Sequence, residues 1–348
     1  MADNYINKMG AGTDNNGFAK VELKEYYERN FLENLRENLF LYNLAKKTTL
    51  PKNTGDTITW RTMDDLTPTR DSSGNILALA ELDERKGLKL EIKEYKTKLN
   101  QYGDVVYLTS KVDTYAIDPI LSETTERMGR LGGETIEELC MKTLISGTNV
   151  FYAGGAASRA EVNSAINRSD LLKIKAFFKR RKVKPHTKGD YIAIIAPEDE
   201  ADLLAEAGNG WVEIAKYAEP AKAFAGEIGK WMGFRWIVSS EVEVTEGGLH
   251  KCIFMGEDAF GVVNIEGESN APSIIYHGPG SSGTNDPFNQ KQSIAWINKG
   301  FGTRILRDAS LVRYECKSGF DVTPATSTDA KHESITAVNT VKGNSFTE

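Results

Sequence analysis

The sequence predicts an α+β protein in which a projecting ribbon and one long helix accompany an α/β region. Three observations predict it. Two segments that alternate like strands flank a polar stretch, 64–86, and residues 122–146 carry the apolar spacing of a single helix. Residues 168–288 then alternate helical and strand-like segments. Such a mixture of local signals is typical of α+β and α/β proteins.

Composition excludes several classes of protein before any motif is considered. Of 348 residues, 40% are hydrophobic and 26% are charged, which excludes a wholly disordered chain. The 43 Lys and Arg against 49 Asp and Glu give a net charge of −6, which argues against a strongly basic nucleic-acid binder. Four His and three Cys are few for a catalytic or metal-binding protein of this length.

Neither the N-terminus nor the cysteines indicate export. The first residues lack the basic and apolar segments of a secretion signal, and no apolar run approaches the roughly 18 residues that span a bilayer. We therefore expect a cytosol-like compartment and no membrane contact. Cys140, Cys252 and Cys316 are odd in number and far apart, so each is interpreted as a small buried hydrophobic residue.

A helix is predicted from Glu22 to Lys47, after an N-terminal stretch without periodicity. Apolar side chains recur every four residues in it, and Lys46 and Lys47 suit the negative end of a helix. Pro51 follows and is expected to stop it.

The ribbon is predicted from alternating residues on both sides of 64–86. Ile58 and Trp60 share one face of a strand at 55–63, and Leu88–Lys93 alternates as its return strand. Gln101–Asp104 is expected to break this pattern before Val105 resumes it. Because an isolated ribbon is marginal in water, we expect it to lie on another surface. A disordered insertion is the alternative.

The strongest helical pattern covers Ser122–Ser146. Its expected apolar stripe includes Met128, Leu131 and Ile136. The glycines within it each cost about 1 kcal/mol relative to Ala, so they mark a bend or a close backbone approach. These are Gly129, Gly132 and Gly133. A phosphate-loop interpretation is weak, because no lysine followed by Ser or Thr accompanies them.

The remaining segments predict a linker followed by an α/β region. The linker is 147–166. Helices are expected at 168–181, 198–204 and 211–217, and strands near 191–196, 233–239, 251–255, 273–276, 293–296 and 305–315.

No motif indicates chemistry. The acidic run Glu198–Glu200 with Asp202 could be a metal site, but a helix N-terminus rich in carboxylates accounts for it better. The basic run Lys173–Lys188 could contact phosphates. Because the whole chain is acidic, we favour a solvated helix face, with Leu172, Ile174, Phe177 and Phe178 facing a core, or a subunit contact. We expect no catalytic residue, no metal, no cofactor and no enzyme activity.

Several short stretches, taken in order, carry a resemblance to a known family. They are Tyr26–Leu32, Gly55–Arg61, Gln101–Thr109, Gly226–Val238 and Ile294–Leu306. Their order and spacing resemble the major capsid proteins of tailed bacteriophages, which share the Hong-Kong-97 fold. The closest resemblance is to the subfamily named after coliphage N-four.

The resemblance implies an α+β, Hong-Kong-97-like capsid fold and a division of the chain into named parts. It implies an N-terminal arm (1–22), an N-terminal helix and connection (23–54), and an extended ribbon loop with its return strand (55–110). The remaining parts are a peripheral domain with the long spine helix (111–166), an axial α/β domain (167–288), strands returning to the peripheral domain (289–318) and a C-terminal tail (319–348).

The resemblance also implies where subunits touch and where one subunit bends. Inter-subunit contacts are expected along the ribbon, and a hinge for shell expansion in the spine helix. The ribbon residues are Trp60, Asp64, Leu77, Leu79, Glu81, Asp83, Arg85 and Lys86, and the hinge residues are Gly129, Gly132 and Gly133. Relatives often carry an acidic–glycine pair at the ribbon tip, which Leu79–Arg85 lacks.

The implied function is a virion capsid protein that forms hexamers and pentamers of an icosahedral shell around double-stranded DNA. The partners are other copies of the chain, a portal, decoration proteins, and DNA without sequence-specific contact, with assembly in the host cytoplasm. The matching segments begin near residue 24, which leaves little room for a fused scaffolding domain and implies either a separate scaffolding protein or none. The alternatives are an encapsulin-like cellular shell protein and a soluble oligomeric α/β enzyme.

Overall fold

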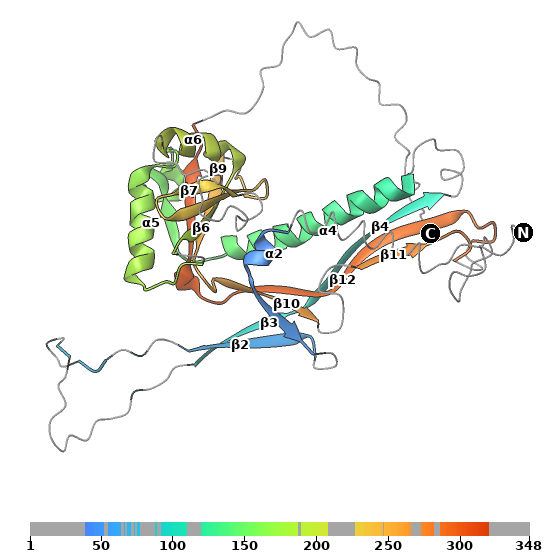
Figure 1. Cartoon of the computed structure of the whole chain (residues 1–348), viewed down its shortest axis with the longest axis horizontal. Coiled ribbons are helices and arrows are strands. Elements are labelled where there is room, and N and C mark those ends of the chain that lie inside the picture. The colour runs from blue at the N-terminus through green and yellow to red at the C-terminus, as the bar shows by residue number, and fades with distance from the viewer. Residues whose placement is uncertain are drawn as a thin grey trace, which may run out of the picture.

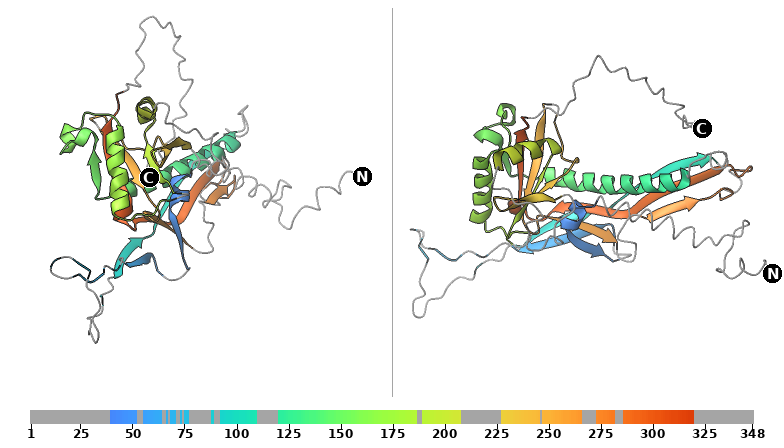
Figure 2. Two further views of the ribbon diagram at one scale, coloured as in Figure 1. Left: turned by 60° about the vertical axis from the view of Figure 1, so that its left-hand side comes forward. Right: turned by 45° about the horizontal axis from the view of Figure 1, so that its top comes forward.

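The computed structural model contains two large sheets. One lies inside a rounded α/β part and the other lies along an elongated part (Figure 1). Helix α4 runs along one side of the elongated part, and a two-stranded ribbon projects from the opposite side (Figure 2). The structure describes residues 39–51, 55–63, 92–109, 120–186, 189–207, 227–245, 247–265, 273–281 and 286–319, with isolated positions between 66 and 88.

The rounded part, here called the axial part, is built on a six-stranded sheet of order β5-β13-β9-β6-β8-β7. The central strand β6 runs parallel to β8 and antiparallel to β9. The strands are β5 (Val150–Tyr152), β6 (Tyr191–Ile195), β7 (Glu227–Trp231), β8 (Phe234–Val238), β9 (Leu249–Met255) and β13 (Leu311–Lys317). Short 3-10 turns at Ala153–Gly155 and Arg159–Glu161 follow β5.

Both faces of this sheet are covered, which explains the continuous apolar sequence of β6. All five of its residues are buried. Ala193 and Ile195 belong to a core cluster with helices α5 (Arg168–Arg180) and α6 (Pro197–Ala207). Ile192 and Ile194 belong to a second cluster, which includes one side of α4. A strand covered on both faces has no solvent side and therefore does not alternate.

The elongated part, here called the peripheral part, has a sheet of order β1-β10-β12-β11, with β4 also paired to β12. Its longest strand, β12, pairs with β4 and β11 in its first part and with β10 in its last. The strands are β1 (Lys46–Leu50), β4 (Asn100–Thr109), β10 (Phe260–Ile265), β11 (Ser273–His277) and β12 (Lys291–Ile305).

Helix α4 (Ile120–Ile145) confirms the predicted long helix, and it is continuous over its 26 residues. Apart from Thr125 near its start, its buried residues come in adjacent pairs four positions apart, which makes one two-residue-wide stripe. The pairs are Met128–Gly129, Gly132–Gly133, Ile136–Glu137, Cys140–Met141 and Leu144–Ile145. The prediction for Leu131 was wrong, because it falls between two pairs and is 40% exposed.

The ribbon consists of β2 (Thr57–Met63) and β3 (Ile92–Lys98), paired from Thr57 opposite Lys98 to Met63 opposite Ile92. Ile58 and Trp60 do share one face, as predicted. That face packs at the ribbon base in a small core cluster with Leu50, Leu99 and Val263. The ribbon is therefore fixed to its own subunit at the base.

Two predictions for the N-terminal half were wrong. Lys46 and Lys47, expected to end a helix, lie in β1, which pairs in parallel with β10. Within the described residues, the four-residue helix α2 (Leu41–Leu44) directly precedes β1. Residues 22–38 lie outside the described part. Gln101–Asp104 does not break a strand but lies inside β4. Gly103 is needed there, since a Cβ atom on it would lie 2.5 Å from the Trp296 carbonyl oxygen.

The two sheets also divide the chain differently from the expected ranges. Strands β10 and β11, within 167–288, join the peripheral sheet, whereas β13 joins the axial sheet. The expected linker 147–166 contributes β5 to the axial sheet. The chain crosses between the parts more often than a linear division allows, since sheet pairing joins segments far apart in sequence. The helix expected at 211–217 lies outside the described residues.

Among the described helices, none combines the length and apolarity needed to cross a bilayer.

The prediction of helix α5 is confirmed within one residue at each end. The predicted start of α6 is also confirmed within one residue, and three carboxylates occupy its first turn. Asn167 caps α5 by accepting a hydrogen bond from the Asp170 N–H at 2.9 Å.

Candidate assembly surfaces

One face of the ribbon packs against its own subunit, and the other face is exposed. On the uncovered face, Met63 and Ile92 lie opposite each other at the outer end and are 58% and 51% exposed. Arg61 and Glu94, the next pair on that face toward the base, form an ion pair at 3.1 Å. Leu66, Ile76 and Leu88, farther out, are all more than half exposed. Apolar side chains concentrated on a projecting element indicate a contact surface.

The face of the peripheral sheet opposite α4 is the second exposed apolar surface. Val106 and Ile294 contact the core cluster that contains α4, so their neighbours Val105 and Tyr107 point the other way. Tyr107 is 75% exposed, and Phe288, in the turn before β12, is 80% exposed. This surface lies toward the far end of the elongated part, away from the axial part (Figure 1).

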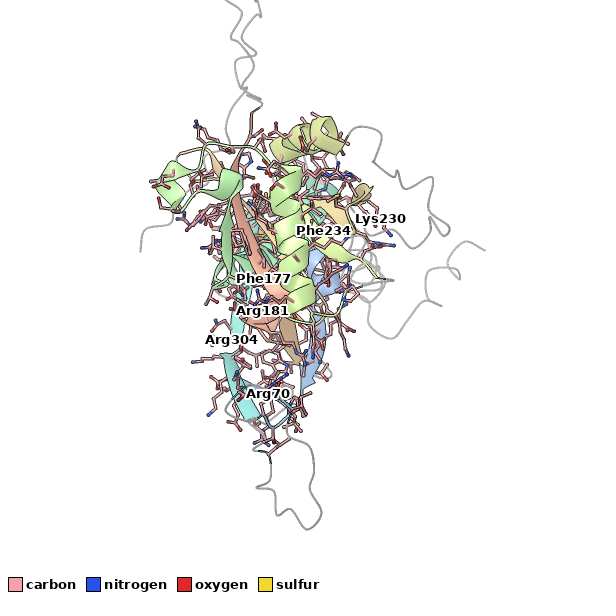
Figure 3. The ribbon with its side chains drawn as sticks, turned by 90° about the vertical axis from the view of Figure 1, so that its left-hand side faces the viewer. Arg70, Phe177, Arg181, Lys230, Phe234 and Arg304 are labelled. Atoms are coloured by element: carbon pink, nitrogen blue, oxygen red, sulfur yellow. The ribbon has the colours of Figure 1, made fainter. Side chains whose placement is uncertain are left out.

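A groove of about 620 Å³ lies between the ribbon base, the C-terminal half of α4 and the last part of β12. Tyr95 and Tyr102 supply aromatic walls, and Lys98, Lys142 and Arg304 supply positive charge. Figure 3 shows Arg304 beneath the axial part, between α5 and the ribbon. The groove therefore opens where the ribbon base meets the peripheral part.

Helix α5 carries the basic run on an exposed side. Ile174 and Phe178 are fully buried as predicted, whereas Leu172 is 49% exposed and does not face the core. The Arg181 guanidinium lies over the Phe177 ring, 4.3 Å from its centroid, at the end of the helix seen in Figure 3. Lys173 pairs with Asp170 at 2.7 Å. These contacts match a solvated helix face.

An open depression at the start of α5 holds the titratable groups Asp170, Lys173 and Glu206. Asp170 already accepts hydrogen bonds from Gly154 N–H at 2.8 Å, Asn167 Nδ2 at 2.9 Å and Tyr314 Oη at 3.3 Å. Burial raises the pKa of Asp170, but Lys173 and these donors outweigh it, so the pKa is lowered overall. The carboxylate therefore holds the fold together, which gives the enzyme alternative no support here.

Glu137 carries a buried carboxyl group within the stripe of α4. Its Oε2 accepts a hydrogen bond from the Leu41 N–H at 2.8 Å and its Oε1 from the Tyr42 N–H at 3.1 Å. Burial raises its pKa to about 8, although both hydrogen bonds act in the opposite direction. The carboxyl group thus ties the start of α2 to the spine helix.

The predicted site residues fall into three groups. Gly129, Gly132 and Gly133 lie together on the buried stripe of α4. Trp60 is only 9% exposed and packs in its own subunit, with Nε1 donating to Thr48 Oγ1 at 3.1 Å, which leaves little of it for a neighbour. The other predicted contacts, Asp64, Leu77, Leu79, Glu81, Asp83, Arg85 and Lys86, lie outside the described residues.

Sequence reasoning did not single out Met63, Ile92, Tyr107 and Phe288 as contact residues. The register could have found the first two, because the alternation that buries Trp60 also places Met63 on the opposite face. Tyr107 needed the knowledge that β4 pairs with β12 rather than with the ribbon.

A family model described as a phage capsid protein matches residues 93–313, which is more than half of the chain. The chain belongs to the phage capsid protein family. The matched range begins in β3 and ends in β13, so it contains α4 and most of both sheets. No curated protein matches this capsid protein by sequence.

Solved structures share the fold of this capsid protein. The capsid of Ralstonia phage GP4 matches with a TM-score of 0.59 at 13% identity, covering 81% of this chain and 88% of that chain. The cyanophage Pam1 capsid matches with a TM-score of 0.56 at 10% identity, covering 78% and 87%. The SrpI encapsulin of Synechococcus elongatus PCC 7942 matches with a TM-score of 0.51 at 14% identity, covering 82% and 90%. The fold is Hong-Kong-97-like.

Proposed function

We propose that this chain is the major capsid protein of a tailed phage, forming hexamers and pentamers of an icosahedral shell around double-stranded DNA. The observation that carries the proposal is the ribbon, which is fixed at its base by Trp60 and exposes Met63 and Ile92 at its outer end. A monomer gains nothing from such an arm. A neighbouring subunit lying under the ribbon would cover it.

The shape of the subunit supports the same function. Two exposed apolar surfaces lie on opposite extensions of one molecule, the ribbon and the far end of the peripheral sheet (Figure 2). Contacts between different surfaces of identical subunits close into rings around local axes, and rings then build a shell. The net charge of −6 suits a container for DNA, because a basic inner wall would bind phosphates tightly.

Size-exclusion chromatography followed by negative-stain electron microscopy tests this function on the purified chain. We expect closed particles of megadalton mass, either alone or with a co-expressed scaffolding protein. A small closed oligomer, found under both conditions, would contradict the proposal.

The finer assignment is also proposed. The segments named above favour the subfamily named after coliphage N-four, with a separate scaffolding protein, a portal, decoration proteins, and assembly in the host cytoplasm. In this assignment the ribbon contacts include Asp64, Leu77, Leu79, Glu81, Asp83, Arg85 and Lys86, and the hinge is Gly129, Gly132 and Gly133. Shells that form uniformly from the chain expressed alone would count against the separate scaffold.

An encapsulin-like cellular shell is the second candidate, favoured by the structural likeness to the SrpI encapsulin. The two functions differ in what the particle contains. Purified particles that hold packaged DNA support the phage capsid, whereas particles that hold one bound cargo protein through a short peptide support the cellular compartment.

A further inference from the structure

A buried cluster of two thiols, a carboxylate and an imidazole lies in the axial part. His250 and Cys252 lie on β9, Cys316 lies on β13, and Asp199 lies in the first turn of α6. Asp199, Cys252 and Cys316 are fully buried, and His250 is 5% exposed. The sequence separates these residues widely, so only the pairing of β9 with β13 beneath α6 brings them together.

The distances among Asp199, Cys252 and Cys316 match those between the ligands of one tetrahedral ion. The Sγ atoms of Cys252 and Cys316 lie 3.8 Å apart. Two sulfurs bound to zinc at about 2.3 Å also lie about 3.8 Å apart. Asp199 places Oδ2 3.2 Å from Cys252 Sγ and Oδ1 3.6 Å from Cys316 Sγ, close to the roughly 3.5 Å expected for sulfur and oxygen ligands of one ion.

Without a cation the cluster satisfies its polar groups poorly. Among the described residues, the His250 imidazole is the only basic group within 4.0 Å of the Asp199 carboxylate. His250 Nδ1 makes no hydrogen bond within the described part of the chain, although Asp199 Oδ1 lies 2.9 Å from it. Thiols are weak donors. The buried Asp199 carboxylate thus has one imidazole and two weak thiol donors around it, an incomplete set of partners that favours a cation.

The register of the sheet argues against a disulfide as the purpose of the two cysteines. Cys252 lies opposite Tyr314, and Cys316 lies opposite His250, so the cysteines are diagonal neighbours on antiparallel strands. Diagonal positions are about 7–8 Å apart, and a disulfide does not bridge Cα atoms more than about 7 Å apart without backbone movement. A metal ion placed between the sulfurs needs no such movement.

We propose that Asp199, Cys252 and Cys316 bind one divalent zinc-type ion, with His250 beside them as the partner that positions the Asp199 carboxylate. Two thiolates with a carboxylate are a ligand set that suits zinc rather than magnesium or calcium. When the ion binds, the two thiol protons pass to solvent and two S–metal bonds form. The proposal concerns the single subunit and does not depend on the capsid function.

The position of the site indicates a structural role. The ion would join α6 to β9 and β13 near the end of the axial sheet where β13 finishes. In the same turn of α6, Asp202 Oδ2 accepts hydrogen bonds from Ser318 Oγ at 2.8 Å and the Gly319 N–H at 3.0 Å. The site therefore lies beside the point where the chain leaves β13 toward its C-terminus.

Cobalt titration of the metal-stripped full-length chain tests the proposal. We expect one Co²⁺ per chain to give the visible bands of a tetrahedral site and a near-ultraviolet sulfur-to-cobalt charge-transfer band, both lost when Zn²⁺ is added. Zn²⁺ should also raise the Tm. A wild-type chain that binds Co²⁺ without a sulfur-to-cobalt band, or does not bind it, would overturn the proposal without a variant.

Matched variants assign the ligands. Cys252→Ser and Cys316→Ser should each weaken the charge-transfer band and lower Zn²⁺ affinity at least 10-fold, whereas Cys140→Ser should change neither, although Cys140 is equally buried. His250→Gln should lower Zn²⁺ affinity while keeping the charge-transfer band, because His250 positions the Asp199 carboxylate and does not bind the ion. A charge-transfer band of wild-type strength in both Cys252→Ser and Cys316→Ser would overturn the assignment.

Discussion

The Glu137 carboxyl group accepts a hydrogen bond from the Leu41 backbone N–H at 2.8 Å, although the two residues lie on different helices. Its second oxygen accepts from Tyr42. One buried side chain of the spine helix thereby satisfies two N–H groups of the short helix α2, which precedes the first strand of the peripheral sheet. Such a carboxyl group should affect both stability and its pH dependence.

Glu137→Gln should destabilise the subunit by about 1–3 kcal/mol, because the amide can accept from one N–H group but leaves the other unpaired. Urea unfolding measures this change. Glu138→Gln, on the exposed side of the same helix, is the matched control and should change stability little, since Glu138 only pairs with Lys142 at the surface. Equal losses in the two variants would contradict this role for Glu137.

The pH dependence follows from the pKa of Glu137, which is raised to about 8 by burial. Between about pH 5 and pH 8 the folded chain keeps a proton that the unfolded chain has released. Raising the pH through this window therefore lowers the free energy of unfolding, by at most about 1.4 kcal/mol per unit for this group. The slope should be smaller in Glu137→Gln. Identical slopes for wild type and variant would show that Glu137 does not cause it.

Trp60→Ala should destabilise the isolated subunit by about 3–5 kcal/mol, because the indole fills the small cluster at the ribbon base. Denaturant unfolding at a subunit concentration too low for assembly measures this loss. Thr59→Ala, the next residue on the exposed face, is the control. A Trp60→Ala subunit that has wild-type stability but fails to assemble would instead support the prediction that Trp60 contacts a neighbouring subunit.

Deletion of 64–86 should leave a folded subunit that does not make stable shells. The five residues 87–91 would then connect Met63 to Ile92, which already pair directly, and five residues suit a hairpin loop. Circular dichroism reports the fold and electron microscopy the shells. Met63→Ser with Ile92→Ser should weaken shells similarly, and Leu204→Ser, on an exposed site of α6, serves as the control. Unfolding of the deletion variant would place the ribbon in the subunit core.

The elements that local pattern controls were predictable from the sequence. The spine helix, α5 and the ribbon strand β2 follow from apolar spacing and from alternation around Trp60. The predictions that were wrong concern residues whose structure depends on partners far away in the sequence. Lys46 and Lys47 are strand residues because β10 lies beside them, and Gly103 sits inside a strand because Trp296 approaches its backbone. The Cys252–Cys316 pair depends in the same way on β9 meeting β13, which no spacing in the sequence reports.

The glycines of the spine helix carry the last prediction. Gly132 and Gly133 form one buried pair of a continuous helical stripe, so in this state the helix is not bent there. Gly132→Ala with Gly133→Ala should slow shell expansion, because each replacement favours the helical backbone by about 1 kcal/mol and opposes bending. Time-resolved scattering of precursor shells measures the rate, and Thr135→Ala is the control on the same helix. Expansion of the double variant at the wild-type rate would place the hinge elsewhere.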